Sequence, residues 1–242
     1  MKNKLVILAI INTLTVFTIT AAQAPMPQPQ LIVTWQVQNY QPADYKGKNL
    51  PTFSSPVIAA IELINNDKLV NLAPAQIIWS QNTDVLVVGA GLKRIAFNAN
   101  DLIGNRLLLK AEINFPEKTQ ENGIIIPKEL QGQSFSGAAI IPVVEPKAVI
   151  AASHVFNQEI KTGAYNFKAM PFFFNIKGLS ELLFTWSVNE QQETVGQNPD
   201  VLNLEITSEN PNPVTLNLTA AISNINNIIE AAKDEIRFIL TP

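Results

Sequence analysis

An internal repeat constrains the fold of this chain more than any other feature of its sequence. A tryptophan, a serine, an asparagine and a Val-Gly pair recur at a constant offset of 107 residues, at Trp79, Ser80, Asn82, Val88 and Gly89 in the first copy and at Trp186, Ser187, Asn189, Val195 and Gly196 in the second. The alternation of apolar and polar residues stays in phase, without a gap, from each tryptophan to Ala111 or Leu218. A slip of one residue would move every apolar side chain to the opposite face of a strand. The maintained phase therefore predicts that the two copies fold alike.

Each copy has the strand pattern of a β-sandwich. In the second copy, Phe184, Trp186 and Val188 alternate with polar or outward-facing residues, and further alternating segments end at Ile206, Ala220 and Leu240. A turn region follows each tryptophan and closes at Gly89 or Gly196, where glycine can supply a positive φ. About seven short strands per copy are typical of an immunoglobulin-like sandwich. The expected fold is all-β, with two tandem immunoglobulin-like domains and a tryptophan buried between the sheets of each.

Proline residues mark the expected domain boundary. Pro142 and Pro146 interrupt a long extended stretch, so we expect the last strand of the first copy to run through 138–144 and the second copy to begin its first strand at Lys147. A short hinge at Glu145-Pro146 separates them. The predicted domains are residues 31–144 and 145–242.

The N-terminal residues 1–24 have the layout of an export signal. Lys2 and Lys4 precede an apolar stretch that begins at Leu5, and Ala22-Gln23-Ala24 provides the small residues of a cleavage site. The alternatives are an uncleaved membrane anchor, in which residues 5–22 span the bilayer, and a buried helix of the fold. Residues 25–30, rich in Pro and Gln, are expected to form an extended spacer. Both the signal and the anchor place the rest of the chain in the periplasm, on the cell surface or in the medium.

Composition excludes several classes of function. The formal net charge of −3 argues against binding to nucleic acid, and the absence of cysteine excludes disulfides and thiolate metal sites. His154 is the only histidine and stands in no nucleophile context. No catalytic, cofactor-binding or metal-binding residue is predicted, and we expect the protein not to be an enzyme.

Two weaker chemical alternatives stay open. Glu190 with Glu193, or Glu117 with Glu121, could form a carboxylate pair, although charges beside turns are usually solvated. Glu145 and Asp200, with nearby asparagines, could offer oxygen ligands for calcium at the domain junction. Neither pattern contains a known calcium loop or catalytic motif.

Three segments are candidates for contact with a partner. The long polar segment 116–137, between the last two strands of the first copy, contains an isoleucine triplet that suggests an extra hairpin. Segment 39–51 carries Tyr40, Tyr45, Lys46 and Lys48, which form an exposed patch or pack beneath the loop. Segment 170–176 is predicted to be a core strand in which one of three adjacent phenylalanines faces the neighbouring domain or a partner. An open sheet edge is a further possible contact.

The sequence resembles tandem bacterial immunoglobulin-like domains, the group that includes polycystic-kidney-disease-type modules, and is similar to exported two-domain proteins of small-genome bacteria whose roles are uncharacterised. The segments that carry this resemblance are 34–51, 77–82, 168–176 and 184–200. It implies a non-catalytic module of the cell envelope or surface, with a spacer, adhesion or assembly role. The alternative is that the chain is an extracytoplasmic hydrolase or an accessory domain of one.

Overall fold

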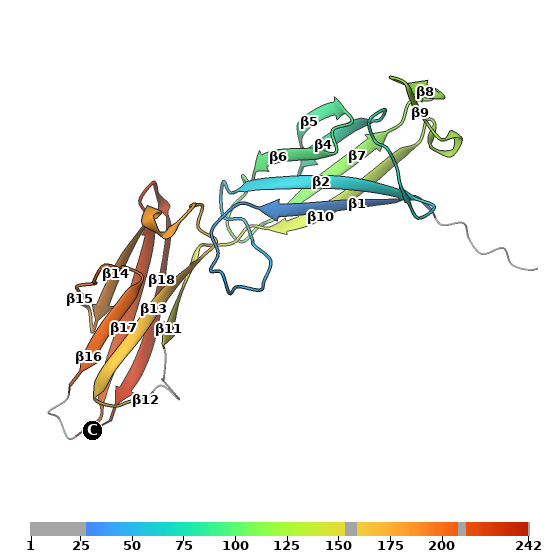
Figure 1. Cartoon of the computed structure of the whole chain (residues 1–242). Coiled ribbons are helices and arrows are strands. Elements are labelled where there is room, and N and C mark those ends of the chain that lie inside the picture. Colours follow the sequence, from blue (N-terminus) through green and yellow to red (C-terminus); the bar gives the residue numbers. More distant parts are fainter. Residues whose placement is uncertain (1–27, 153–158, 208–211, 242) are drawn as a thin grey trace, which may run out of the picture.

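The computed structural model describes residues 28–152, 159–207 and 212–241 of the 242 residues. The predicted signal or anchor 1–24, residues 25–27 of the spacer, and His154 lie outside the described residues. The protein consists of two β-sandwiches placed end to end, so that the chain enters at the far end of the first and leaves at the far end of the second (Figure 1). No helix in the described part is long and apolar enough to cross a membrane.

The first domain pairs two antiparallel sheets. One sheet has the order β1-β2-β3 with β6 also paired to β2, and the other has the order β10-β7-β4-β5. A separate hairpin, β8-β9, and a 3-10 turn, η1, lie between β7 and β10. The bounds are β1 Gln30–Val37, β2 Pro56–Asn65, β3 Lys68–Leu69, β4 Gln76–Gln81, β5 Asp84–Ala90, β6 Arg94–Asn98, β7 Arg106–Asn114, β8 Gln120–Glu121, β9 Ile124–Ile125, η1 Lys128–Leu130 and β10 Ser134–Pro142.

The second domain repeats this arrangement. Its sheets have the orders β11-β13-β16 and β12-β18-β17-β14-β15. The first domain has two four-stranded sheets, and the second has a three-stranded and a five-stranded sheet. In both domains the chain crosses between the layers as it does in an immunoglobulin-like sandwich. The bounds are β11 Lys147–Ala152, β12 Glu159–Ile160, β13 Gly163–Phe172, η2 Leu179–Glu181, β14 Leu182–Val188, β15 Gln191–Glu193, β16 Val201–Ile206, β17 Val214–Asn224 and β18 Asn227–Leu240.

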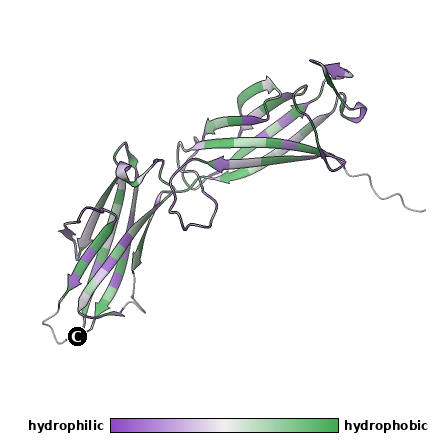
Figure 2. Cartoon of the chain, in the orientation of Figure 1, coloured by the Kyte–Doolittle hydropathy of each residue, from purple (hydrophilic) through white to green (hydrophobic). Residues whose placement is uncertain are grey.

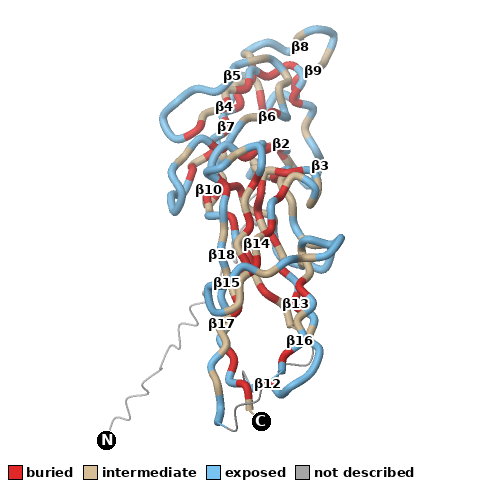
Figure 3. Tube along the Cα trace, turned by 90° about the vertical axis from the view of Figure 1, so that its left-hand side faces the viewer, coloured by how far each residue is buried: buried red, intermediate tan, exposed pale blue. Residues whose placement is uncertain are grey.

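Alternation along the strands builds one core in each domain. Along β2, buried residues alternate with more exposed ones, and the same alternation recurs along β7 and β14. Figure 2 shows apolar and polar positions interspersed along the strands, and Figure 3 shows buried and exposed positions along the chain. Trp79 and Trp186 are fully buried, one in each core. The tryptophan positions and the all-β tandem fold that the sequence predicted are thereby confirmed.

The repeat extends to hydrogen bonds that the sequence does not display. The indole N–H of Trp79 donates to the carbonyl of Leu92 at 2.8 Å, and that of Trp186 donates to the carbonyl of Pro199 at 3.1 Å. Both acceptors lie the same distance along the chain from their tryptophan. A buried indole needs such an acceptor. In both copies the buried indole N–H is therefore satisfied by a backbone carbonyl at the equivalent position of the repeat.

The turn after each tryptophan strand corrects one expectation. Glycine was predicted to supply the positive φ, but Gly89 lies inside β5 and neither it nor Gly196 has a positive φ. The repeated asparagines do so instead, with φ of 53° at Asn82 and 46° at Asn189. Each also accepts a 2.9 Å hydrogen bond through its side-chain oxygen, from the backbone N–H of Leu108 or Asn217. Asparagine tolerates this left-handed conformation and adds a bond that glycine cannot make.

The constant sequence offset of the repeat, which the unbroken alternation suggested, does not hold beyond β6 and β16. Trp79 on β4 pairs with Ala111 on β7, and Trp186 on β14 pairs with Ala220 on β17. The two alanines are two residues further apart along the chain than the two tryptophans are. An insertion of two residues preserves alternation, because the side-chain period of a strand is two. The apolar pattern therefore stayed in phase while the true register moved.

Three predicted boundaries also differ from the structure. Segment 224–235, the counterpart of the 116–137 loop in the second copy, was expected to connect the last two strands as a loop, but β17 runs to Asn224 and β18 begins at Asn227, so that most of the segment belongs to a long hairpin. Segment 170–176 is only partly a strand, because β13 ends at Phe172. Strand β10 begins at Ser134, inside the predicted 116–137 loop, and ends at Pro142.

Candidate functional site: the domain junction

Buried polar side chains mark the junction between the two domains. Five polar or charged residues are buried among the described residues, and all except Gln81 belong to the junction: Thr52, Ser55, Asn224 and Glu230. A buried polar group is costly unless it is hydrogen-bonded, so a cluster of this kind specifies a particular geometry. The junction is therefore the most distinctive polar site in the described chain.

Asn175 is the residue that connects the two sides. The hydroxyl of Ser55 donates to its side-chain oxygen at 2.6 Å, and its side-chain nitrogen donates to the hydroxyl of Thr52 at 3.0 Å. The same nitrogen lies 3.3 Å from the carbonyl oxygen of Phe53. Thr52 and Ser55 are also hydrogen-bonded to each other: the backbone N–H of Thr52 donates to the hydroxyl of Ser55 at 2.8 Å. Asn175 thus occupies a polar socket provided by the first domain.

On the other side, Asn175 is held by a buried carboxylate. The Asn175 backbone N–H donates to Oε2 of Glu230 at 3.0 Å, its side-chain nitrogen donates to Oε1, and the side-chain nitrogen of Asn224 donates to Oε2 at 2.9 Å. Glu230 is 4% exposed. Several N–H donors stabilise a buried carboxylate without a cation. The long β17–β18 hairpin places both Asn224 and Glu230 at this end of the second domain (Figure 1).

A short backbone pairing lies beside this network. The N–H of Tyr40 donates to the carbonyl of Phe174 at 2.8 Å, and the N–H of Phe173 donates to the carbonyl of Tyr40 at 3.0 Å, forming an isolated antiparallel bridge. The side chain of Asn39 also donates to the carbonyl of Phe173 at 3.2 Å. Segment 39–51 of the first domain is therefore joined to the second domain by main-chain hydrogen bonds.

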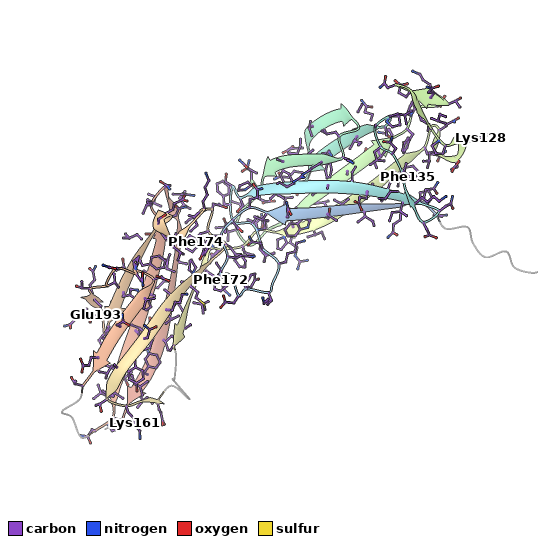
Figure 4. The ribbon with its side chains drawn as sticks, viewed as in Figure 1. Lys128, Phe135, Lys161, Phe172, Phe174 and Glu193 are labelled. Atoms are coloured by element: carbon purple, nitrogen blue, oxygen red, sulfur yellow. The ribbon has the colours of Figure 1, made fainter. Side chains whose placement is uncertain are left out.

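Aromatic packing completes the contact. The ring of Tyr45 lies edge-on to Phe172 and Phe173, with centroid separations of 5.4 and 5.9 Å. Phe173 has a φ of 65°, which breaks the strand alternation and turns Phe174 into the second core. Figure 4 shows Phe172 and Phe174 at the junction end of β13. The expectation that one of the three phenylalanines faces the neighbouring domain is met by Phe172, together with Phe173.

The predicted patch on segment 39–51 is used within the chain. Tyr40 packs against the second core, and burial, followed by the nearby charge of Asp200, raises its pKa above the usual value. Lys48 lies 3.3 Å from the centre of the Trp35 ring, and desolvation lowers the pKa of its ammonium. Of the two alternatives from the sequence, packing beneath the loop describes both tyrosines.

The second predicted segment, 116–137, forms the expected extra hairpin at the opposite end of the first domain. Asn122 and Gly123 turn between β8 and β9 with positive φ. Ile126 and Leu130 are buried in the first core, while Ile125 is 75% exposed. A groove of about 370 Å³ runs between this insertion and the segment that follows β2, and it is lined by residues that include Lys68, Leu69, Ile125 and Glu129.

The acids of the two carboxylate alternatives lie in loop and hairpin segments. Glu121 forms an ion pair with Lys118 at 3.2 Å, while Glu190 lies in a turn and Glu193 in the edge strand β15. The described residues contain no group of three or more His, Asp or Glu side chains arranged to hold a metal ion. The grooves of the first domain that contain Glu62, Glu112 or Glu129 have one carboxylate each.

Sequence reasoning missed the junction residues. Thr52, Ser55 and Asn175 were not singled out, and Glu230 was assigned to a loop. The available signal was weak: Asn175 stands as a single polar residue between apolar neighbours, and Glu230 follows two isoleucines. A polar residue inside an apolar run indicates a buried hydrogen-bonded position, but it does not identify the partner.

Comparisons with known proteins give only distant structural matches. No protein-family profile matches the sequence, and no curated protein is similar to it. Among solved structures, the three N-terminal domains of the highly immunogenic outer capsid protein of bacteriophage RB49 match at 10% identity and a TM-score of 0.41, covering 86% of this chain and 59% of that one. A D1–D4 ectodomain fragment of ICAM-5 matches at 8% identity and a TM-score of 0.27, covering 86% and 53%. This chain thus spans little more than half the length of either neighbour, and its assignment as two tandem immunoglobulin-like sandwiches rests on its own strand order.

Proposed function

We propose that this chain is a non-catalytic, exported module of the cell envelope that serves as a stiff two-domain spacer. The observation that carries the proposal is the Asn175 network, which fixes the orientation of two sandwiches arranged end to end. Domain interfaces held only by a linker leave relative motion as the default. The hydrogen bonds of the Asn175 network at the junction oppose that motion.

The direction of the chain supports a spacer role. Gln30, at the start of β1, pairs with Ile64, and the neighbouring Asn65 bonds to Glu129 of the insertion. The point where the described chain begins and the 116–133 insertion therefore share one end of the first domain, and the C-terminal strand ends at the far end of the second (Figure 1). With the N-terminal segment retained as an anchor, the first domain would lie next to the membrane and hold the second away from it.

The envelope location rests on the N-terminal signal pattern and on the resemblance of segments 34–51 and 184–200 to tandem bacterial immunoglobulin-like domains. The absence of enzyme activity is proposed on the same resemblance.

Fractionation of the full chain tests the location. The chain carrying a C-terminal tag, expressed in a bacterial host, should reach the extracytoplasmic fraction and become accessible to added protease. The matched control is Leu8→Arg, which places a charge in the apolar stretch and should retain the protein in the cytoplasm. Equal retention of both proteins in the cytoplasm would contradict export.

A further inference from the structure

The side chain of Asp234 crosses the corner at which the two sheets of the second domain meet. Asp234 lies on β18, and its Oδ2 accepts a 2.7 Å hydrogen bond from the backbone N–H of Ile150 on β11. The two strands belong to different sheets and share no ladder, although they lie in contact. The bond is therefore a side-chain link between the sheets at their edges.

The N–H of Ile150 points away from its own sheet. Strand β11 is the terminal strand of the described order β11-β13-β16. Ile150 pairs with Ala169, whose own N–H donates to the carbonyl of Asp200 on the β16 side of β13. Two opposite residues of an antiparallel ladder exchange both of their hydrogen bonds or neither, so the N–H and C=O of Ile150 face outward from the sheet edge. The carboxylate of Asp234 thus occupies a position at which another strand would bond.

The composition of β11 makes its edge prone to strand addition. The strand reads KAVIAA, with one charged residue at its start and no proline. An apolar edge strand of this kind templates pairing with another strand unless a feature of the fold protects it, and an inward-pointing charged side chain is one such feature. Asp234 meets this description, because it is half-buried on the inner face of β18, between Ala232 and Ile236, which pack against the second core.

The first domain closes the same corner by different means. In each domain the buried tryptophan pairs with an alanine, and that alanine pairs on its other side with the residue at the corner: Trp186, Ala220 and Asp234 in the second domain, and Trp79, Ala111 and Gly137 in the first. A Cβ on Gly137 would stand 3.0 Å from side-chain carbons of Leu31 and Val33. Aliphatic side chains of β1 therefore fill, in the first domain, the place that the carboxylate takes in the second.

We propose that Asp234 protects the outer edge of β11: by accepting from Ile150 it holds this strand beside β18 and excludes strand addition by another chain, including a second copy of this protein. An incoming strand would have to displace the carboxylate from the N–H of Ile150. The displaced carboxylate would remain half-buried without its hydrogen bond, which is unfavourable. The contact is therefore autoinhibitory, since it keeps a strand-addition edge of the second domain closed.

Hydrogen exchange of the Ile150 amide in the full chain, followed by NMR, tests the contact itself. In Asp234→Ala this amide should exchange at least about tenfold faster than in the wild type, because its acceptor is removed. Asp234→Asn keeps an acceptor oxygen of the same reach and should retain most of the protection. The matched control is Glu235→Ala, because Glu235 forms an exposed ion pair with Lys233 at 3.7 Å. An exchange rate at Ile150 that is the same in Asp234→Ala and in the wild type would overturn the proposal.

Sedimentation equilibrium of the full chain tests the protective role. Asp234→Ala should associate at least about tenfold more strongly than the wild type and Glu235→Ala, and adding Ala151→Lys to it should reverse the effect, because a lysine on an edge strand opposes pairing. If circular dichroism shows that Asp234→Ala does not fold, Asp234→Ser, whose hydroxyl is one bond shorter than the carboxylate, takes its place. Association equal to that of the wild type, or association that persists in the double variant, would show that Asp234 does not protect β11.

Discussion

The hydroxyl of Ser55 in the first domain donates a 2.6 Å hydrogen bond to the side-chain oxygen of Asn175 in the second. The other end of that amide contacts both Thr52 and the buried carboxylate of Glu230. One side chain therefore satisfies polar groups of two domains, and its loss would leave buried partners unpaired on both sides. Such an arrangement fixes the relative orientation of the two domains more effectively than apolar contact alone, because all of its hydrogen bonds form in only one orientation.

Replacing Asn175 by alanine should loosen the junction while leaving both sandwiches folded. Removing one partner from buried polar groups costs about 1–3 kcal/mol for each group left unsatisfied. We expect small-angle scattering to show a wider distribution of overall dimensions, and calorimetry to separate one thermal transition into two. The matched control is Asn166→Ala, because the side chain of Asn166 donates to exposed Asn203 within the second domain and takes no part in the junction network. Unchanged scattering for Asn175→Ala would contradict the assigned role of the network.

Truncation of the repeated tryptophans should be the most costly single change in each core. We expect Trp79→Ala and Trp186→Ala each to lower the free energy of unfolding of its own domain by about 3–5 kcal/mol. Trp35→Ala, at a half-buried position on β1, should cost less. Chemical denaturation followed by fluorescence measures all three. A cost for Trp35→Ala as large as the other two would show that indole burial between the sheets is not the dominant factor.

The sequence was sufficient for the sandwiches because alternation reports directly on burial. The positions of Trp79 and Trp186, and the inward faces of β14 and β17, follow from a period of two. The same period concealed the shift of β17 relative to β7, since only an odd insertion disturbs alternation. It also gave no reason to prefer Asn82 over Gly89 for the left-handed residue, because both types adopt that conformation.

The junction lay beyond sequence reasoning for a different reason. Ser55 and Asn175 are separated by 120 positions along the chain, and no local pattern records which distant residues meet. Tyr45 illustrates the difficulty: an aromatic residue in a polar loop is compatible with an open binding patch and with packing beneath the loop. Only the placement of Phe172 and Phe173 beside its ring decides between them.

Acid should weaken the first domain in part through Asp101. Hydrogen bonds from the side chains of Asn105 and Asn82, followed by the backbone N–H of Leu102, hold the pKa of its carboxyl below the ordinary value of 3.8, against a smaller opposing effect of burial. The folded-state pKa is thus below the unfolded one. The carboxylate therefore stabilises the fold above the unfolded value, and this stabilisation is lost as the pH falls through the folded value.

In Asp101→Asn the free energy of unfolding should consequently fall less steeply with decreasing pH below about pH 4. Its dependence on pH near neutrality should change little. Denaturation midpoints measured from pH 2 to pH 7 test this, and Asp44→Asn, at an exposed position of segment 39–51, is the control. A curve for Asp101→Asn that retains the wild-type slope in acid would show that the hydrogen bonds do not discriminate between the charged and neutral carboxyl.

In the insertion between β7 and β10, substitutions at Ile126 and Leu130 should destabilise the first domain, whereas a substitution at Ile125 should have little effect. Ile126 and Leu130 are buried in the first core, so Ile126→Ala or Leu130→Ala should cost about 2–4 kcal/mol in the free energy of unfolding. Ile125→Ala, one residue away and 75% exposed, should change it by less than about 0.5 kcal/mol. Urea denaturation of the three variants measures the difference. Equal, small costs for all three would mean that the insertion lies loosely on the domain and does not anchor its end, whereas a large cost at Ile126 and Leu130 leaves only its outer face, around Ile125, available to a partner.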